Sequence, residues 1–207
     1  MKISYAITVC NEYEEIQKLI STLMLNTNGE DEVIVLFDKK AGTAEVWDYL
    51  VGLQSQDLIK AYPKAFKGHF ADWKNKLTSY CSGDYIFQID ADEIPNEVLL
   101  SNLKGIIENN PDNEVFLVPR VNTVEGLTQE HTTKWRWNID DEGRVNWPDY
   151  QWRIWKNKPE IKWVNKVHER LEGFKTYAPL PAFHDLALVH PKTIERQEKQ
   201  NAYYDTL

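Results

Sequence analysis

Five consecutive apolar residues, Val33 to Phe37, constrain the fold more than any other feature of the sequence. A run without alternating polar positions is typical of a strand that is buried on both faces, as strands of parallel sheets are. β-branched residues are also frequent in residues 3–9, which predicts another strand. Between the two runs, apolar residues recur at helical spacing over residues 13–25. Strand, helix and strand in this order predict a sheet covered by helices.

The alternation of strands and helices continues along the first half of the chain. Asn11 stands where the N-cap of the first helix is expected, with Glu14 three residues later as its capping-box partner. The resulting order, β-α-β-α-β-α-β, predicts an α/β fold with a mostly parallel sheet flanked by helices. Residue spacing predicts the further helices over residues 43–53, 70–81 and 99–107, and the further strands over residues 58–62, 85–89 and 114–121.

Composition excludes several classes of protein. The chain has 207 residues, of which 42% are hydrophobic and 27% charged, so it can bury a core as an ordinary globular domain does. A net charge of −8 argues against a general nucleic-acid binder, because phosphate contacts need an excess of lysine and arginine. No apolar run approaches the roughly 18 residues of a membrane span, and the N-terminus does not resemble a signal peptide. We therefore predict a cytoplasmic protein.

An acidic run follows the strand over residues 85–89. Asp90 and Asp92 are separated only by Ala91, whose small side chain leaves both carboxylates free to bind one hard cation. Alternatively, Asp92 and Glu93 could cap the next helix.

Polar residues also follow two other strands, namely Asn11 with Glu12, and Asp38. Ligands of parallel sheets bind at the carboxyl ends of the strands, where these side chains would meet. Their common position favours a ligand and metal site at Asp90 and Asp92 over a simple helix cap.

After residue 121 the sequence changes character and becomes rich in tryptophan. Short strands and turns predict an antiparallel, Trp-rich C-terminal part. The aromatic residues could form a compact core, or an apolar platform for sugar rings or bases, and both could hold for different residues. Six of the eight tryptophans of the chain fall in this part: Trp135, Trp137, Trp147, Trp152, Trp155 and Trp163.

Six segments, in their order along the chain, resemble motifs of the GT-A-type glycosyltransferases of family 2. Residues 83–93 carry the strongest similarity, to a "GDyIlxlDaDE" stretch, and residues 167–171 resemble a "vHExl" segment of the small soluble, lipopolysaccharide-core-type subgroup. Residues 39–43 depart from the family pattern, which has a further acid and serine there. The remaining similar segments are residues 8–12, 35–38, 70–75 and 150–155.

The resemblance implies a single GT-A domain over residues 1–207, with a Rossmann-like sheet. Residues 1–121 would bind a nucleotide-sugar donor, a UDP-sugar first of all, and residues 122–207 would face the acceptor. The implied activity is inverting transfer of a sugar to a hydroxyl group of a glycan, a lipid-linked acceptor or a modified base. The expected cofactor is a divalent cation, Mn²⁺ or Mg²⁺, which would offset the charge of the leaving diphosphate.

The resemblance also assigns roles to individual residues. Asp92 would bind the metal directly, Asp90 would bind metal or ribose, and His190 would complete the metal site, with His184 as the alternative. The donor-binding residues would be Asn11, Glu12, Asp38, Lys74, Asp90 and Arg153.

An inverting transfer requires a general base that removes the proton of the attacking hydroxyl. Glu169 and Asp149 are the two candidates; the resemblance of residues 167–171 to a family segment ranks Glu169 first, and Asp149 stays open as the alternative. Two other functions remain open. A nucleotidyltransferase or sugar-nucleotide pyrophosphorylase also uses acids at strand ends, although it usually has a Gly-rich basic loop after the first strand. A non-catalytic carbohydrate-binding relative would keep the tryptophans without the chemistry.

Overall fold

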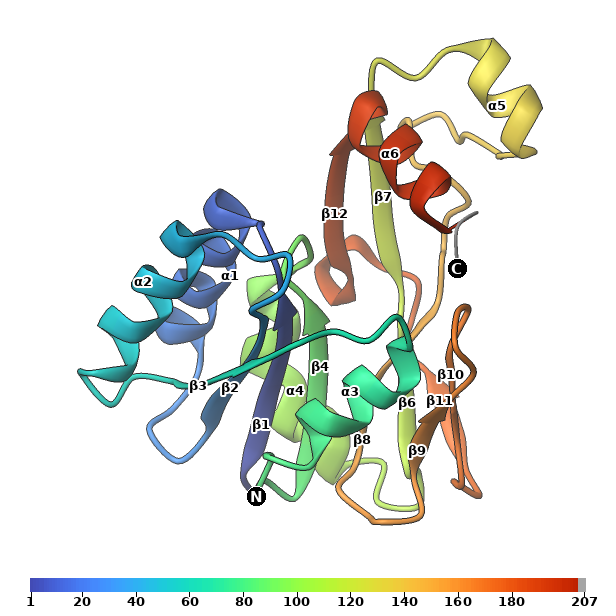
Figure 1. Ribbon diagram of the computed structural model, residues 1–207. Coiled ribbons are helices and arrows are strands. Elements are labelled where there is room, and N and C mark those ends of the chain that lie inside the picture. Colours follow the sequence, from blue (N-terminus) through green and yellow to red (C-terminus); the bar gives the residue numbers. More distant parts are fainter. Residues whose placement is uncertain (205–207) are drawn as a thin grey trace.

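The computed structural model describes residues 1–204, which fold around a seven-stranded mixed sheet (Figure 1). The strand order is β11-β6-β8-β4-β1-β2-β3, and β8 runs antiparallel to both of its neighbours. The other pairs of this sheet are parallel, so the predicted α/β class with a mostly parallel sheet is confirmed. The strands are β1 (Ile3–Val9), β2 (Glu32–Asp38), β3 (Lys60–Lys64), β4 (Tyr85–Asp90), β6 (Val115–Val118), β8 (Gln151–Lys156) and β11 (Tyr177–Pro179).

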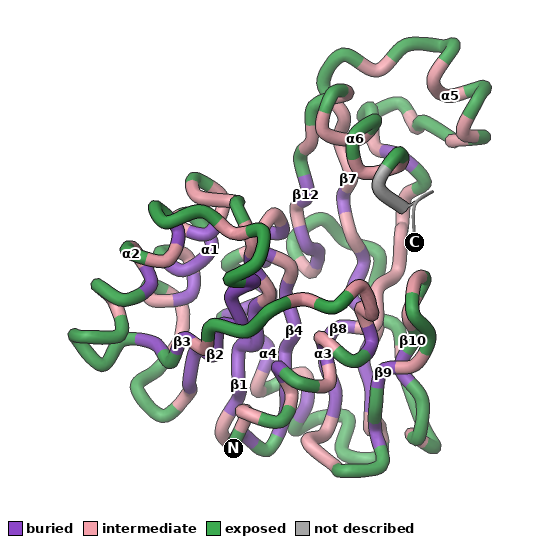
Figure 2. Tube along the Cα trace, viewed as in Figure 1, coloured by how far each residue is buried: buried purple, intermediate pink, exposed green. Residues whose placement is uncertain are grey.

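Alternate residues of the central strands face two separate hydrophobic cores. Tyr5 and Ile7 belong to the core under three helices, α1 (Tyr13–Asn26), α2 (Ala44–Gln54) and α4 (Glu97–Glu108). Ala6, between them, belongs to the core on the opposite face, with Ala71 and Leu77 of α3 (Phe70–Thr78). This double burial explains the uninterrupted apolar run of β2, and Figure 2 shows the central strands buried between exposed helices.

A second, three-stranded sheet extends beyond one edge of the first, towards the top of Figure 1. It consists of β5 (Ile94–Pro95), β12 (Leu188–Thr193) and β7 (Arg120–Glu125), in the order β5-β12-β7. β7 follows β6 after a single residue, Pro119, so one extended segment serves both sheets. Two helices lie at this end of the molecule, α5 (Gln129–Trp135) and α6 (Ile194–Tyr204).

The C-terminal part is only partly antiparallel. β8 and the hairpin of β9 (Lys162–Val164) and β10 (Arg170–Glu172) have antiparallel pairings, whereas β7 with β12 and β6 with β11 pair in parallel. The tryptophans do not form one cluster. Trp155 and Trp163 are buried in the second core, whereas Trp135 and Trp137 lie at and just after α5.

Several predicted boundaries were wrong. The strand predicted over 58–62 is β3 at Lys60–Lys64, since Pro63 is tolerated in an edge strand. The helix predicted over 70–81 ends at Thr78, and the strand predicted over 114–121 is two strands, β6 and β7. The N-cap of α1 is Glu12 and not Asn11, and its side chain forms no cap hydrogen bond. Among the described residues, no helix is long and apolar enough to cross a membrane.

Candidate functional site

A pocket of about 850 Å³ opens at the carboxyl ends of the parallel strands. β1 and β4 pair in a register that sets Thr8 beside Asp90, and Asp38 ends the next strand, β2. This arrangement places the polar strand ends at one edge of the sheet, as predicted. All ten site residues predicted from the sequence line the pocket: Asn11, Glu12, Asp38, Lys74, Asp90, Asp92, Asp149, Arg153, Glu169 and His190.

Asp90 is fixed by hydrogen bonds on both carboxylate oxygens. Its Oδ2 accepts a hydrogen bond from Arg153 at 2.7 Å, and its Oδ1 accepts from Thr8 at 3.3 Å and from Gln88 at 3.2 Å. Burial alone would raise the pKa of Asp90, but the positive charges of Arg153 and Lys74 outweigh burial and hold this pKa well below its usual range. Asp90 is therefore ionised at neutral pH.

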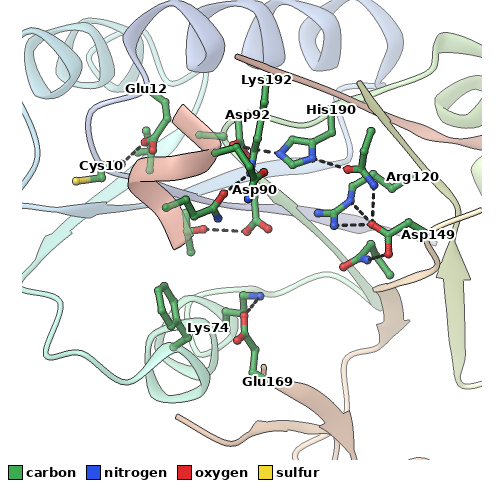
Figure 3. A pocket seen from close by; sticks show the side chains of 18 of the residues that line it. Cys10, Glu12, Lys74, Asp90, Asp92, Arg120, Asp149, Glu169, His190 and Lys192 are labelled. Carbon is green, nitrogen blue, oxygen red and sulfur yellow. Dashed lines mark hydrogen bonds and ion pairs between the residues drawn. The ribbon is translucent and has the colours of Figure 1, made fainter. Parts of the chain in front are cut away.

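Asp92 faces His190 across a distance of 3.3 Å between Oδ2 and Nε2 (Figure 3). Burial would raise the pKa of Asp92, but the hydrogen bond and charge of His190 overcome this effect and lower it. The prediction that His190 lies at a strand end was wrong. His190 is the third residue of β12, which continues to Thr193. By contrast, His184 is exposed, at the start of a short 3-10 helix, His184–Leu186, and does not line the pocket.

A hydrogen-bond chain fixes which nitrogen of His190 faces Asp92. The carboxylate of Asp149 can only accept, so Asn122 donates its Nδ2 to it at 2.8 Å and presents its Oδ1 to His190. His190 Nδ1 lies 2.7 Å from that oxygen and must therefore carry the proton. The lone pair of neutral His190 would then point at the Asp92 carboxylate, an unfavourable contact unless a proton or a metal cation lies between them.

Two further basic residues from the C-terminal end of the chain approach Asp92. Arg196 of α6 lies 3.5 Å from Asp92 Oδ2 and 3.7 Å from Glu12 Oε1, and it also pairs with Glu15 of α1. Lys192 is on the same strand as His190, two residues later, and donates to Gln200 at 2.5 Å. Burial lowers the pKa of Lys192, with the charge of Asp92 acting in the opposite direction. Asp92 thus has two cationic side chains close to it, of which Lys192 also lines the pocket.

Glu12 closes the turn after β1. Its Oε2 accepts hydrogen bonds from the backbone N–H groups of Cys10, at 2.8 Å, and Asn11, at 3.1 Å. Burial raises the pKa of Glu12, and the negative charge of Asp92 adds to the effect. These contacts explain why Glu12, the N-cap residue, leaves the first turn of α1 uncapped: its carboxylate stabilises the preceding turn.

A buried ion network lies beneath the acidic run. Glu93 is fully buried and accepts from Arg153 at 2.5 Å and from Arg120 at 2.8 Å. Arg120 also donates to Asp149 at 2.6 Å, and these interactions lower the pKa of Asp149, against the effect of its burial. Arg153, 2% exposed, therefore bonds two carboxylates of the protein itself, Asp90 and Glu93.

Two more of the predicted residues, Lys74 and Glu169, lie below Asp90 in Figure 3. Lys74 of α3 donates to Glu169, and its Nζ lies 4.5 Å from the centre of the Trp163 ring. Both side chains line the pocket and are mostly buried. Glu169 is thus, like Asp149, a pocket carboxylate that is available as a candidate for the general base.

Asp38 and Asn11 lie at the far end of the pocket. Asp38 is 7% exposed, and its Oδ1 accepts from the backbone N–H groups of Lys40, at 2.9 Å, and Phe66, at 3.0 Å. Asn11 is an exposed residue of the turn after β1. Asp38 is thus held in a fixed position by its loop, as a residue that recognises one group of a ligand must be.

The sequence analysis missed the pocket residues Arg120, Asn122 and Lys192, and also Arg196, which contacts Asp92 without lining the pocket. Lys192 could have been found, because residues two apart on a strand share a face and His190 was already a candidate. Arg120 and Asn122 could not, because their partners are 27 to 68 residues away in the sequence, and only the tertiary fold, such as the pairing of β7 with β12 that brings Asn122 to His190, shows these contacts.

Comparisons with solved structures show the same fold. TarS of S. aureus matches with a TM-score of 0.58 at 15% identity, over 87% of this chain and 37% of TarS. Residues 1–349 of TarS in complex with UDP match with a TM-score of 0.59 at 16% identity, over 87% of this chain and 61% of that one. The complex of the same fragment with UDP-GlcNAc matches with a TM-score of 0.55 at 14% identity, over 90% and 60%.

This chain therefore spans less than two thirds of each of these TarS chains. No curated protein sequence matches it significantly. The sequence model described as "Glycosyl transferase family 2" matches residues 4–175, which is most of the chain. With the mostly parallel sheet and the acidic strand end already described, this match identifies the protein as a member of glycosyl transferase family 2.

Proposed function

We propose that the protein is an inverting, metal-dependent glycosyltransferase that moves a sugar from a nucleotide-sugar donor to a hydroxyl acceptor. The observation that carries this proposal is the Asp92–His190 pair beside Asp90, at the carboxyl end of a parallel sheet in a family 2 member. Solved structures of the same fold, at low identity, contain UDP and UDP-GlcNAc, which supports a UDP-sugar as the donor.

Asp92 and His190 fit a divalent cation. Two neighbouring ligands of an octahedral ion, each about 2.1 Å from it, are about 3 Å apart, close to the 3.3 Å between Asp92 Oδ2 and His190 Nε2. Among residues 1–204, no three His, Cys, Asp or Glu side chains converge, so donor oxygens and water would supply the remaining ligands. A bound Mg²⁺ or Mn²⁺ would act as a Lewis acid and offset the charge that develops on the diphosphate.

The protein's own residues would hold the rest of the donor. Lys192 and Arg196 add positive charge beside Asp92, where the diphosphate of the donor would lie. Asp38 has the fixed position expected of an acceptor for the base imide N–H, as the resemblance implies. Arg153 would act indirectly, because its ion pair keeps Asp90 ionised and oriented at the ribose or metal.

Glu169 is the better candidate for the general base. Asp149 is occupied by hydrogen bonds from Arg120, Asn122 and Gln151, and its pKa is lowered, which makes it a weak proton acceptor. Glu169 lines the pocket and accepts from Lys74, which could orient the carboxylate towards an acceptor hydroxyl.

The function is tested with a panel of UDP-sugars, by measuring UDP release with and without Mn²⁺. Release of UDP that needs Mn²⁺ supports the proposal. Release of pyrophosphate when a nucleoside triphosphate and a sugar phosphate are supplied would indicate a nucleotidyltransferase instead. Absence of any turnover, with glycan binding retained, would indicate a non-catalytic carbohydrate-binding protein.

Replacing His190 with glutamine will raise the Mn²⁺ concentration needed for half-maximal turnover. We expect at least a tenfold increase, since loss of even a residue that supports a metal ligand costs about 10–100-fold in affinity. His184→Gln is the matched control, because His184 is exposed and outside the pocket, and it should leave the Mn²⁺ dependence unchanged. If His184→Gln raises the required Mn²⁺ concentration and His190→Gln does not, His184 is the metal-binding histidine.

Replacing Glu169 with glutamine will lower kcat by roughly 10²–10⁴-fold, the usual contribution of a general base. Transfer to azide, a nucleophile with no proton to lose, should be much less affected, and this comparison separates lost base catalysis from a disturbed Lys74. Asp149→Asn is the comparison variant. If Asp149→Asn rather than Glu169→Gln shows the selective loss with hydroxyl acceptors, Asp149 is the base.

A further inference from the structure

The pocket extends beyond the carboxylates, along the second sheet and into the segment that follows α5. Its wall there includes Trp137, Val145, Asn146, Gln197 and Gln200, which we call the Trp137 arm. None of these residues has a part in holding the donor as proposed above. The arm begins at the metal pair and leads away from Asp38, where the nucleotide base would bind.

Backbone pairing connects the Trp137 arm directly to the metal pair. Val145 N donates to Asn122 O at 2.9 Å and forms a β-bridge with Asn122, whose side chain bonds His190. Asn146 N in turn donates to Asn138 O at 2.8 Å, and Asn138 N donates to Asn146 Oδ1 at 2.9 Å. Trp137 thus precedes Asn138, which is two pairing steps from β7, the strand whose Asn122 bonds His190.

The Trp137 ring is supported by other aromatic rings. Its centroid lies 4.7 Å from that of Trp135, which is itself stacked on His131 at 5.2 Å. His131 Nε2 lies 3.7 Å from Glu198 Oε1 of α6, so the ring stack lies against the helix that also carries Gln197 and Gln200. Trp137 remains partly exposed and lines the pocket. A large apolar surface in a fixed position at a pocket wall is typical of a binding site, not of a core.

The polar residues of the arm are amides. Asn146, Gln197 and Gln200 carry no charge, and amide groups form the hydrogen bonds that recognition of hydroxyl groups requires. One amide atom of each is held within the protein: Asn146 Oδ1 by Asn138, Gln197 Nε2 by Asn201 and Gln200 Oε1 by Lys192. The nearby cations, Lys192 and Arg196, are the ones assigned above to the diphosphate of the donor, so they are not part of the arm. An aromatic face combined with neutral amides suits the apolar face and hydroxyl edge of a neutral sugar ring.

We propose that the Trp137 arm is the acceptor subsite and that it binds a neutral sugar residue of a glycan. This inference rests on the proposed function, because it names the class of acceptor for the same site. A nucleic-acid acceptor would also stack on tryptophan, but it would bring phosphates into a protein of net charge −8, beside amides.

The test measures binding of methyl glycosides of common neutral hexoses and N-acetylhexosamines by saturation-transfer NMR, with UDP and diamagnetic Mg²⁺ present. The same titration includes 5-hydroxymethyl-2′-deoxycytidine as the base-type probe. We expect at least one glycoside to bind the wild-type protein. Trp137→Ala should weaken its binding about tenfold, the order of one aromatic contact, and Trp137→Phe about threefold or less.

Two controls separate this proposal from the proposed function. Phe183→Ala removes an aromatic side chain that is 65% exposed and outside the pocket, and it should change no affinity. UDP affinity should be the same in all variants, because the arm does not hold the donor. Failure of the wild-type protein to bind UDP would count against the proposed function itself. With UDP bound, the acceptor proposal is overturned by glycoside binding that survives Trp137→Ala, by no glycoside binding, or by selective binding of the nucleoside.

Discussion

Replacing Asp92 with asparagine will reduce sugar transfer by about a thousandfold, while the protein remains folded. Asparagine keeps the size of the side chain and one oxygen, but it loses the negative charge that faces His190, Arg196 and the proposed cation. A single electrostatic contact to a developing charge contributes about 10²–10³ to kcat, and loss of a metal ligand adds to that effect. UDP release at saturating donor and Mn²⁺ measures the loss.

The control for this substitution is Asp48→Asn, because Asp48 is exposed on α2, outside the pocket. It should retain full activity, and both variants should keep the circular dichroism spectrum of the wild-type protein. Addition of a chelator to the wild-type protein should reproduce the effect of Asp92→Asn. Full activity of either the chelated protein or the variant would contradict the proposed role of Asp92.

Replacing Glu93 with glutamine will destabilise the fold rather than change the chemistry directly. Glu93 has no exposed surface and compensates two guanidinium groups, those of Arg120 and Arg153. Removing one partner from a buried ion pair costs about 3–5 kcal/mol, because buried charge loses compensation, and here Arg120 would keep Asp149 alone of its two carboxylates and Arg153 would keep Asp90. For a chain of this size, that loss corresponds to a decrease in Tm of about 6–20 °C.

Urea denaturation measures the free energy of unfolding of Glu93→Gln against that of Glu108→Gln. Glu108 is exposed at the end of α4, and its substitution should change this free energy by less than about 0.5 kcal/mol. Equal stability of the two variants would mean that the arginines find other partners, and that the ion network is not what stabilises this part of the fold.

The polar strand ends could be predicted from the sequence because a parallel sheet brings them together by its topology alone. Buried strands identify themselves by apolar runs, so the residue after each run, such as Asp38 or Asp90, is assigned to one edge of the sheet without knowledge of any side-chain contact. This prediction does not require the exact ends of the strands. The predicted position of β3 was two residues too early, and this error did not change the predicted site.

The surroundings of His190 could not be predicted in the same way. The partner of its Nδ1 is Asn122, on a strand that pairs with β12 in a second sheet, and no local pattern indicates that this sheet exists. The roles of the arginines were also hidden. From the sequence, Arg153 was expected to bind the donor. In the structure it is buried between the carboxylates of Asp90 and Glu93.

The pairing of β5 with β12 has a consequence for the Asp-Ala-Asp motif. Asp90 is the last residue of β4 in the large sheet, whereas Asp92 lies two residues before β5, whose Ile94 pairs with Val189, next to His190. The two aspartates of one three-residue motif therefore lie beside strands of different sheets, and the backbone N–H of Glu93, which donates to Asp90 O at 2.9 Å, closes the turn between those strands. A displacement of one sheet relative to the other would therefore act on the turn at Ala91. It would change the distance between Asp90 and the Asp92–His190 pair.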